Sequence, residues 1–213
     1  MIAMVTRLPR PTLGPVLFAI ALLFAAAPLQ PAHAERDWDP GDFIKELSDR
    51  AIGKLTDEST GEQEKEQQFR VLMTEGFDIR AIGQFVLGRY WRRASPVQRR
   101  NFMAEFEDMI VYRFLPLFAE YSGETLEIGL IRPFSENPNF FNVATRLELS
   151  GSEPINVDFR VRRAEAAYKI VDVVAEGVSY AVTLRSEYGS VLKQNGGDMN
   201  ALIRIMREAK ASL

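Results

Sequence analysis

Between residues 40 and 121, apolar residues recur every three or four positions, which is the period of an amphipathic helix. This spacing predicts helices over residues 43–55, over a charged segment that ends at Gly76, and after Asp78. A further helix should begin at Ser95, where an N-cap Ser, a Pro at the first helical position and a Gln at the third form a strong start signal. Pro116 should kink or end that helix.

Local signals mark other helix ends. The sequence Ser59-Thr60-Gly61-Glu62 has the pattern of a capping box and should open the charged helix. Asp78 is a candidate N-cap for the helix that follows it, and Gly88 is a candidate C′ residue at the end of the same helix. These signals predict helix boundaries from a few neighbouring residues.

From residue 124 to residue 176 the apolar positions alternate, which is the period of a strand. In the first of these strands, Leu126, Ile128 and Leu130 should share the apolar face. Short connections between the strands predict an antiparallel meander. The segments with this pattern are Thr125–Leu130, Phe141–Leu149, Ile155–Arg162 and Tyr168–Ala175.

Helical spacing returns between residues 178 and 210, where Asp198 should cap the last helix. The order of helices, strands and helices predicts an α+β fold, in which helices cover the apolar face of a four-stranded antiparallel sheet. A sheet of this kind curls readily, and under long helices it can enclose a pocket.

The first 34 residues have the three parts of a secretory signal. Arg7 and Arg10 supply positive charge, an apolar run follows, and Ala32-His33-Ala34 is a small-x-small cleavage site. The apolar run Val16–Ala27 is too short to cross a hydrocarbon core of about 30 Å, which makes a membrane anchor the weaker interpretation. We expect cleavage after Ala34 and export to the periplasm, leaving residues 35–213 as a single soluble domain.

The composition excludes several kinds of chemistry. The chain has no Cys, and its sole His, His33, lies within the predicted signal. The exported form would therefore lack thiol nucleophiles, disulfides, a lipid-modified cysteine, imidazole bases and His-ligated metals. The net charge of −3, which becomes more negative once Arg7 and Arg10 are removed, argues against a nucleic-acid partner. Any enzyme would have to use Asp, Glu, Lys, Tyr, Ser or Thr.

A series of short motifs follows the predicted signal in a characteristic order. They are Phe77-Asp78-Ile79, Phe85-Val86-Leu87-Gly88-Arg89-Tyr90-Trp91, Gln98-Arg99 with Phe102 and Phe106, Tyr121-Ser122-Gly123, Val157-Asp158-Phe159, Tyr168-Lys169-Ile170-Val171-Asp172-Val173, Glu176-Gly177-Val178-Ser179 and Arg185-Ser186. In order and spacing they resemble the MlaC family of periplasmic phospholipid-transport proteins, also called the toluene-tolerance auxiliary family. The resemblance covers roughly residues 40–195.

This resemblance implies a nuclear-transport-factor-like or cystatin-like core with extra terminal helices, around a deep apolar cavity for the acyl chains of a glycerophospholipid. It also implies shuttling between an outer-membrane lipoprotein–porin complex and an inner-membrane ABC transporter with an MCE-domain subunit, which would maintain outer-membrane lipid asymmetry. On this interpretation the protein is not an enzyme, carries phospholipid as cargo and needs no cofactor. We expect a monomer, because a shuttle must keep its surface free for two docking partners.

The residues expected to line the cavity face inward from the strands and from the aromatic-rich helices. For any one of them ordinary packed core is the favoured interpretation, and only the resemblance favours an open cavity for the set. They are Phe85, Phe106, Ile110, Phe114, Leu126, Ile128, Val143, Leu147, Val157, Phe159, Ile170, Val173, Leu184 and Tyr188.

Clustered arginines provide candidates for the polar end of such a ligand. Arg89, Arg92, Arg93 and Arg99, with Arg100 beside them, lie close together in an otherwise acidic chain. Guanidinium groups pair well with a lipid phosphate and with an acidic partner surface. The alternative is a solvated helix face.

Asp172 is unusual because it lies within an apolar strand, where an acid is disfavoured. We expect it to pair with an arginine or to cap the turn near Gly177. If it points into a pocket instead, burial would raise its pKa, and it could act as a base with Tyr168 or Tyr180. That second hypothesis describes an enzyme for a small apolar substrate on the same scaffold.

Overall fold

A computed structural model describes residues 39–149, 151–164 and 167–211, and the predicted export signal at residues 1–34 lies outside this part. The helices before the sheet are α1 (Pro40–Leu55), α2 (Glu62–Gly76), α3 (Ile79–Leu87), α4 (Arg89–Arg93), α5 (Pro96–Phe114) and the short 3-10 helix η1 (Leu115–Phe118). The strands are β1 (Thr125–Pro133), β2 (Phe140–Glu148), β3 (Ile155–Ala164), β4 (Ala167–Ala175) and β5 (Val178–Ser179). The helices after the sheet are α6 (Tyr180–Gln194) and α7 (Met199–Ala211).

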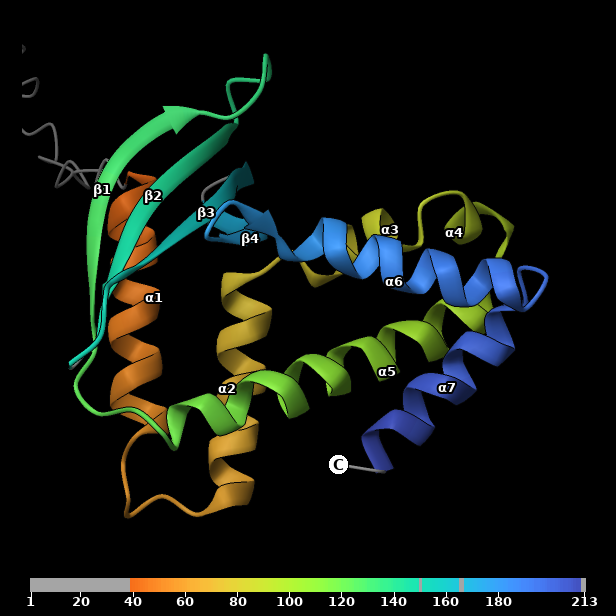
Figure 1. Ribbon diagram of the computed structural model, residues 1–213, viewed down its shortest axis with the longest axis horizontal. Helices are drawn as coiled ribbons and strands as arrows, with labels where there is room; N and C mark the ends of the chain where they lie inside the picture. The colour runs from red at the N-terminus through yellow and green to blue at the C-terminus, as the bar shows by residue number, and fades with distance from the viewer. Residues whose placement is uncertain (1–38, 150, 165–166, 212–213) are drawn as a thin grey trace, which may run out of the picture. The chain divides into compact units, whose positions relative to one another are not determined.

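The strands form one antiparallel sheet in the order β1-β2-β3-β4-β5, and Figure 1 shows that this sheet is curved. The predicted α+β class and antiparallel meander are confirmed, whereas the predicted count of four strands was wrong. The fifth strand arises because Glu176 and Gly177 both have positive φ angles, 47° and 78°, which make a tight turn. The turn folds Val178 and Ser179 back onto the end of β4.

An irregularity in β1 changes which side chains face the core. Ile128 pairs with Thr145, but Ile131, three residues further on, pairs with Val143, so β1 has one extra residue in this interval. A β-bulge of this kind reverses the alternation of side chains. Leu130, predicted on the apolar face, is therefore 55% exposed, and Ile131 packs against the core in its place.

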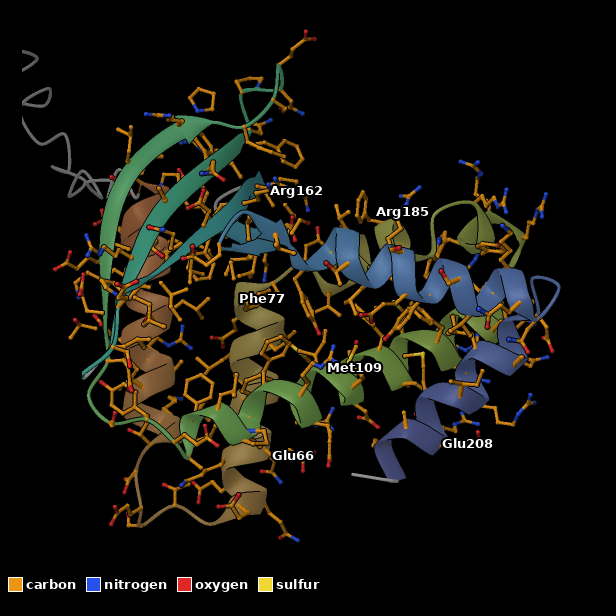
Figure 2. The ribbon with its side chains drawn as sticks, in the orientation of Figure 1. Glu66, Phe77, Met109, Arg162, Arg185 and Glu208 are labelled. Atoms are coloured by element: carbon orange, nitrogen blue, oxygen red, sulfur yellow. The ribbon has the colours of Figure 1, made fainter. Side chains whose placement is uncertain are left out.

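Two clusters of buried side chains stabilise the described residues. The sheet cluster joins Ile44 of α1 to Val143 and Ile170 of the sheet. The helix cluster lies among α3, α5, α6 and α7, where Phe102 is completely buried. Phe77 packs against both clusters, and Figure 2 shows it at the end of α2, between the sheet and the other helices. Phe77 therefore lies where the two clusters meet.

Most helix ends follow the local signals. Asp78 Oδ1 accepts a first-turn N–H of α3 at 3.0 Å, and Gly88 ends that helix with a φ of 53°. Ser95 and Gln98 form both hydrogen bonds of a capping box at the start of α5. The same helix gives way to η1 just before Pro116, as predicted.

The capping box predicted at Ser59 was wrong. α2 begins at Glu62, and its N-cap is Gly61, which has no side chain to accept a hydrogen bond. The Ser59 hydroxyl instead donates to Asp57 Oδ1 at 2.7 Å, and the Ser59 N–H donates to the same oxygen at 2.9 Å. Asp57 therefore holds Ser59 in a local turn, which competes with helix initiation at this position.

The two serines provide a matched test of capping. Ser95→Ala should lower the free energy of unfolding by about 1 kcal/mol, because it leaves the Gln98 N–H without its acceptor. Ser59→Ala should change it by less than about 0.5 kcal/mol, since Ser59 is exposed and caps no helix. Urea unfolding of both variants measures the difference, and equal losses would contradict the assignment of the two caps.

Candidate functional site

A large apolar cavity lies between the sheet cluster and the helix cluster. Its volume is about 580 Å³, and its wall includes side chains from α1, α2, α3, α5, α6, η1 and the sheet. The wall residues with polar side-chain atoms are Ser48, Asp172, Tyr180 and Thr183, and the others are aliphatic or aromatic. Such a wall favours hydrocarbon and offers a ligand few hydrogen-bond partners.

Eight of the residues predicted from the sequence lie in the cavity wall. They come from α5, β1, β3, β4 and α6, so the structure brings together segments far apart in the chain. Contact between these side chains and an acyl chain stays a prediction. The eight residues are Phe106, Ile110, Phe114, Leu126, Phe159, Ile170, Val173 and Leu184.

Four other predicted residues, Ile128, Val143, Leu147 and Val157, lie in the sheet but outside the cavity wall. α1 packs over part of the apolar face through Ile44, so that Val143 and Ile128 belong to the sheet cluster there. Leu147 and Val157 are half-buried in neighbouring strands. The alternation of apolar and polar residues identified the apolar face of the sheet, but the position of α1 decides which part of that face borders the cavity.

The remaining two predicted residues lie on helices, away from the wall. Phe85 is 43% exposed on α3, and the Arg185 guanidinium lies 4.9 Å from the centre of its ring. Tyr188 is buried in the helix cluster, edge-on to Phe102 and Phe106. An apolar helical stripe is wider than one contact surface, so it includes residues turned to the core or to solvent.

About half of the wall residues missing from the prediction come from α1 and α2. Their helical spacing is visible in the sequence as an apolar stripe, which indicates a buried face but not what that face touches. The apolar residues of α1 and α2 in this group are Ile44, Leu47, Ala51, Ile52, Leu55, Phe69, Leu72 and Met73.

In the part of the chain that the structure describes, Arg89, Arg92, Arg93 and Arg99 are absent from the cavity wall. Figure 1 shows α4, which carries three of them, on the side of the helices away from the sheet. Arg99 donates to the Trp91 carbonyl at 2.9 Å and stacks over the indole, which ties the start of α5 to α4. The geometry therefore gives no support to a contact between these arginines and a ligand in the cavity.

Asp172, a candidate base in the sequence, is engaged by three donors. It is 7% exposed, and its Oδ2 accepts from Arg160 at 2.8 Å and from the Ser179 hydroxyl at 2.6 Å. Its Oδ1 accepts the Ala181 N–H at 3.0 Å. The expectation that Asp172 pairs with an arginine or caps a turn is confirmed, because it joins β3, β4 and the first turn of α6. Tyr168, one of its suggested catalytic partners, instead accepts a hydrogen bond from Arg163 at 2.7 Å.

The wall residues Ala175 and Val178, just before the start of α6, are exposed, so we infer that the cavity reaches the surface there. Val178 belongs to the wall and is nevertheless 62% exposed. Tyr180 borders this opening, with its ring edge-on to Phe114 at a centre-to-centre distance of 5.2 Å and its hydroxyl accepting from Arg113 at 3.1 Å. Burial raises the pKa of the Tyr180 phenol, although the hydrogen bond from Arg113 acts in the opposite direction. The hydroxyl therefore stays protonated at neutral pH.

The residues that the structure describes offer neither a metal-binding cluster nor a helix suited to span a membrane. None of their acidic, His or Cys side chains gather in threes that could hold a metal ion. None of their helices combines the length and the apolar character needed to cross a membrane. The cavity is thus the feature that sets this fold apart from a solidly packed α+β domain.

A curved sheet and helices around an apolar cavity define a class of protein, one that binds a hydrophobic ligand. A family model described as MlaC protein matches residues 45–208 of this chain. The chain therefore belongs to the MlaC family, which confirms the resemblance of the sequence motifs.

Two individual proteins are also similar to this chain. A Haemophilus influenzae protein named intermembrane phospholipid transport system binding protein MlaC is 26% identical over 124 residues, which are 57% of this chain and 58% of the relative. The match thus spans less than two thirds of that relative's length. A solved structure of a phospholipid-binding protein from Ralstonia solanacearum, in complex with a phospholipid, has a TM-score of 0.72 at 19% identity and covers 82% of this chain and 98% of the other. This likeness shows that the two proteins share a fold.

Proposed function

We propose that this protein binds a phospholipid, with the acyl chains in the cavity, and carries it through an aqueous compartment. The observation that carries the proposal is the cavity, about 580 Å³ of space with an almost wholly apolar wall. Each methylene removed from water contributes about 0.8 kcal/mol, so two chains of about sixteen carbons would cost on the order of 25 kcal/mol if left in water. A carrier replaces the bilayer with a protein wall of similar apolar character.

The proposal also includes the membranes between which the lipid is carried. The Haemophilus influenzae relative is named for an intermembrane transport system, and the predicted signal at residues 1–34 would send residues 35–213 to the periplasm. We infer a monomeric shuttle between an outer-membrane lipoprotein–porin complex and an inner-membrane ABC transporter with an MCE-domain subunit. Phospholipid is the cargo of this shuttle, which needs no cofactor.

Native mass spectrometry of the protein purified from the periplasm tests the carrier function. The folded protein should carry the additional mass of a phospholipid, and denaturation should release that mass into an organic extract. Delipidated protein should then take up phospholipid from vesicles, because its apolar wall again becomes available. A folded protein that is isolated empty and takes up no phospholipid would refute the proposal.

A further inference from the structure

Among the residues that the structure describes, the cationic side chains of Arg160 and Arg113 donate hydrogen bonds to residues of the cavity wall. Arg160 is ion-paired with Asp172 at 2.8 Å, so its charge is already balanced within the protein. Arg113 instead donates to the neutral hydroxyl of Tyr180 at 3.1 Å. Within the described residues Arg113 forms no ion pair, and Glu187 attracts it only at longer range. Arg113 is therefore available to an anionic ligand.

Arg113 lies next to wall residues near the inferred opening of the cavity. The residue that follows it on α5, Phe114, belongs to the wall, and so does its hydrogen-bond partner Tyr180. Val178, two residues before Tyr180, is in the wall and 62% exposed, whereas Arg113 itself is exposed to solvent. A ligand with its hydrocarbon inside the cavity would thus leave its polar end beside Arg113.

We propose that Arg113, together with the Tyr180 hydroxyl, binds the phosphodiester of the cargo lipid at the cavity mouth. This inference rests on the proposed function. A guanidinium has five N–H donors in a planar fork that matches phosphate oxygens, and the Tyr180 hydroxyl accepts one of them. Because that hydroxyl acts as the acceptor toward Arg113, its own proton is free to donate to a phosphate oxygen. The pair selects lipids that contain a phosphate over uncharged lipids with the same acyl chains.

The first turn of α6 is not a competing anion site. Its N–H groups at Ala181 and Val182 already donate to Asp172 Oδ1 at 3.0 Å and to Ser179 Oγ at 3.1 Å. The guanidinium of Arg113 therefore supplies the charge at the mouth. Its pKa is raised chiefly by the hydrogen bond to Tyr180, so it is cationic at any physiological pH.

Competitive uptake from vesicles tests the proposal. Delipidated protein is incubated with vesicles that contain phosphatidylglycerol and diacylglycerol with identical acyl chains, and mass spectrometry of the re-isolated protein gives the ratio of the two bound lipids. Arg113→Gln should lower this ratio about fivefold, a typical effect of one partly exposed charge-assisted contact. Tyr180→Phe removes one hydroxyl and should lower the ratio by a smaller factor. Arg204→Gln is the matched control, because Arg204 is exposed on α7 outside the wall, and it should leave the ratio unchanged.

The outcomes separate this inference from the function on which it rests. If wild-type protein takes up neither lipid, the proposed function fails, and the headgroup site fails with it. If wild-type protein takes up lipid but Arg113→Gln keeps the wild-type ratio, the headgroup site is wrong and the carrier function stands. An equal loss of both lipids in Arg113→Gln would also contradict the proposed headgroup site, since it would show that Arg113 shapes the cavity mouth without binding the phosphate.

Discussion

Phospholipid uptake should fall roughly fiftyfold when Ala51 is replaced by Trp, while the protein stays folded. Ala51 is a half-buried residue of α1 and belongs to the cavity wall. An indole at this position would occupy space that the acyl chains need, and excluding three methylenes at about 0.8 kcal/mol each accounts for a loss of that size. Because the ring enters a hollow and not a filled core, the cost of overpacking should be small.

Glu46→Trp is the matched control for this change, because Glu46 is exposed on the same helix and lies outside the wall. Both variants are measured by uptake of phosphatidylglycerol from vesicles, and thermal unfolding confirms that each is folded. Glu46→Trp should bind as the wild type does. Undiminished uptake in folded Ala51→Trp would show that the lipid does not occupy this part of the cavity.

The midpoint of thermal unfolding should fall by about 8 °C when Asp172 is replaced by Ala. The change leaves Arg160 without its ion pair and removes the acceptor of the Ser179 hydroxyl and the Ala181 N–H. Loss of one partner from a buried pair costs about 3–5 kcal/mol, but the Arg160 side chain is 27% exposed, so we expect about 2–3 kcal/mol. For a chain of this size each kcal/mol lowers the unfolding midpoint by roughly 3 °C, so a loss of about 2–3 kcal/mol gives a shift of about 8 °C.

Asp158→Ala is the control, since Asp158 is half-buried one strand away and accepts one hydrogen bond, from Asn142 at 2.9 Å. It should cost less than about 1 kcal/mol. Lipid uptake by Asp172→Ala, measured well below its unfolding midpoint, should stay near that of the wild type. A variant with unchanged stability that loses a chemical turnover would instead support the catalytic interpretation of Asp172.

Residues close together in the chain determined much of the local structure. Ser95 and Gln98 form their capping box within a single turn, and Asp78 caps α3 in the same way, so neither depends on distant packing. The limit of such signals is visible at Ser59, where the same pattern fails because Asp57 is a nearer partner. Alternation likewise predicted the strands, but the bulge in β1 turned Leu130 outward.

Arg113, one of the two polar residues at the cavity mouth, could not be distinguished from the sequence. Arg113 is one arginine among many, and the cluster on α4 is the more conspicuous feature of the chain. Arg113 reaches the wall because α6 returns to α5 and places Tyr180, 67 residues later, against it. Contacts of this separation depend on how the helices pack, which no local pattern encodes.

The sequence by itself determined the α+β class, the order of its main elements, most of its helix caps and, outside the bulge in β1, the apolar face of each predicted strand. The tertiary structure alone decided which of those apolar residues surround the cavity. Ile170 and Val143 both belong to the sheet cluster. Ile170 also lies in the cavity wall, whereas Val143 contacts only other protein side chains. The hydrophobic effect is non-directional: periodicity reports that a side chain is removed from water, but not whether protein or ligand replaces the water.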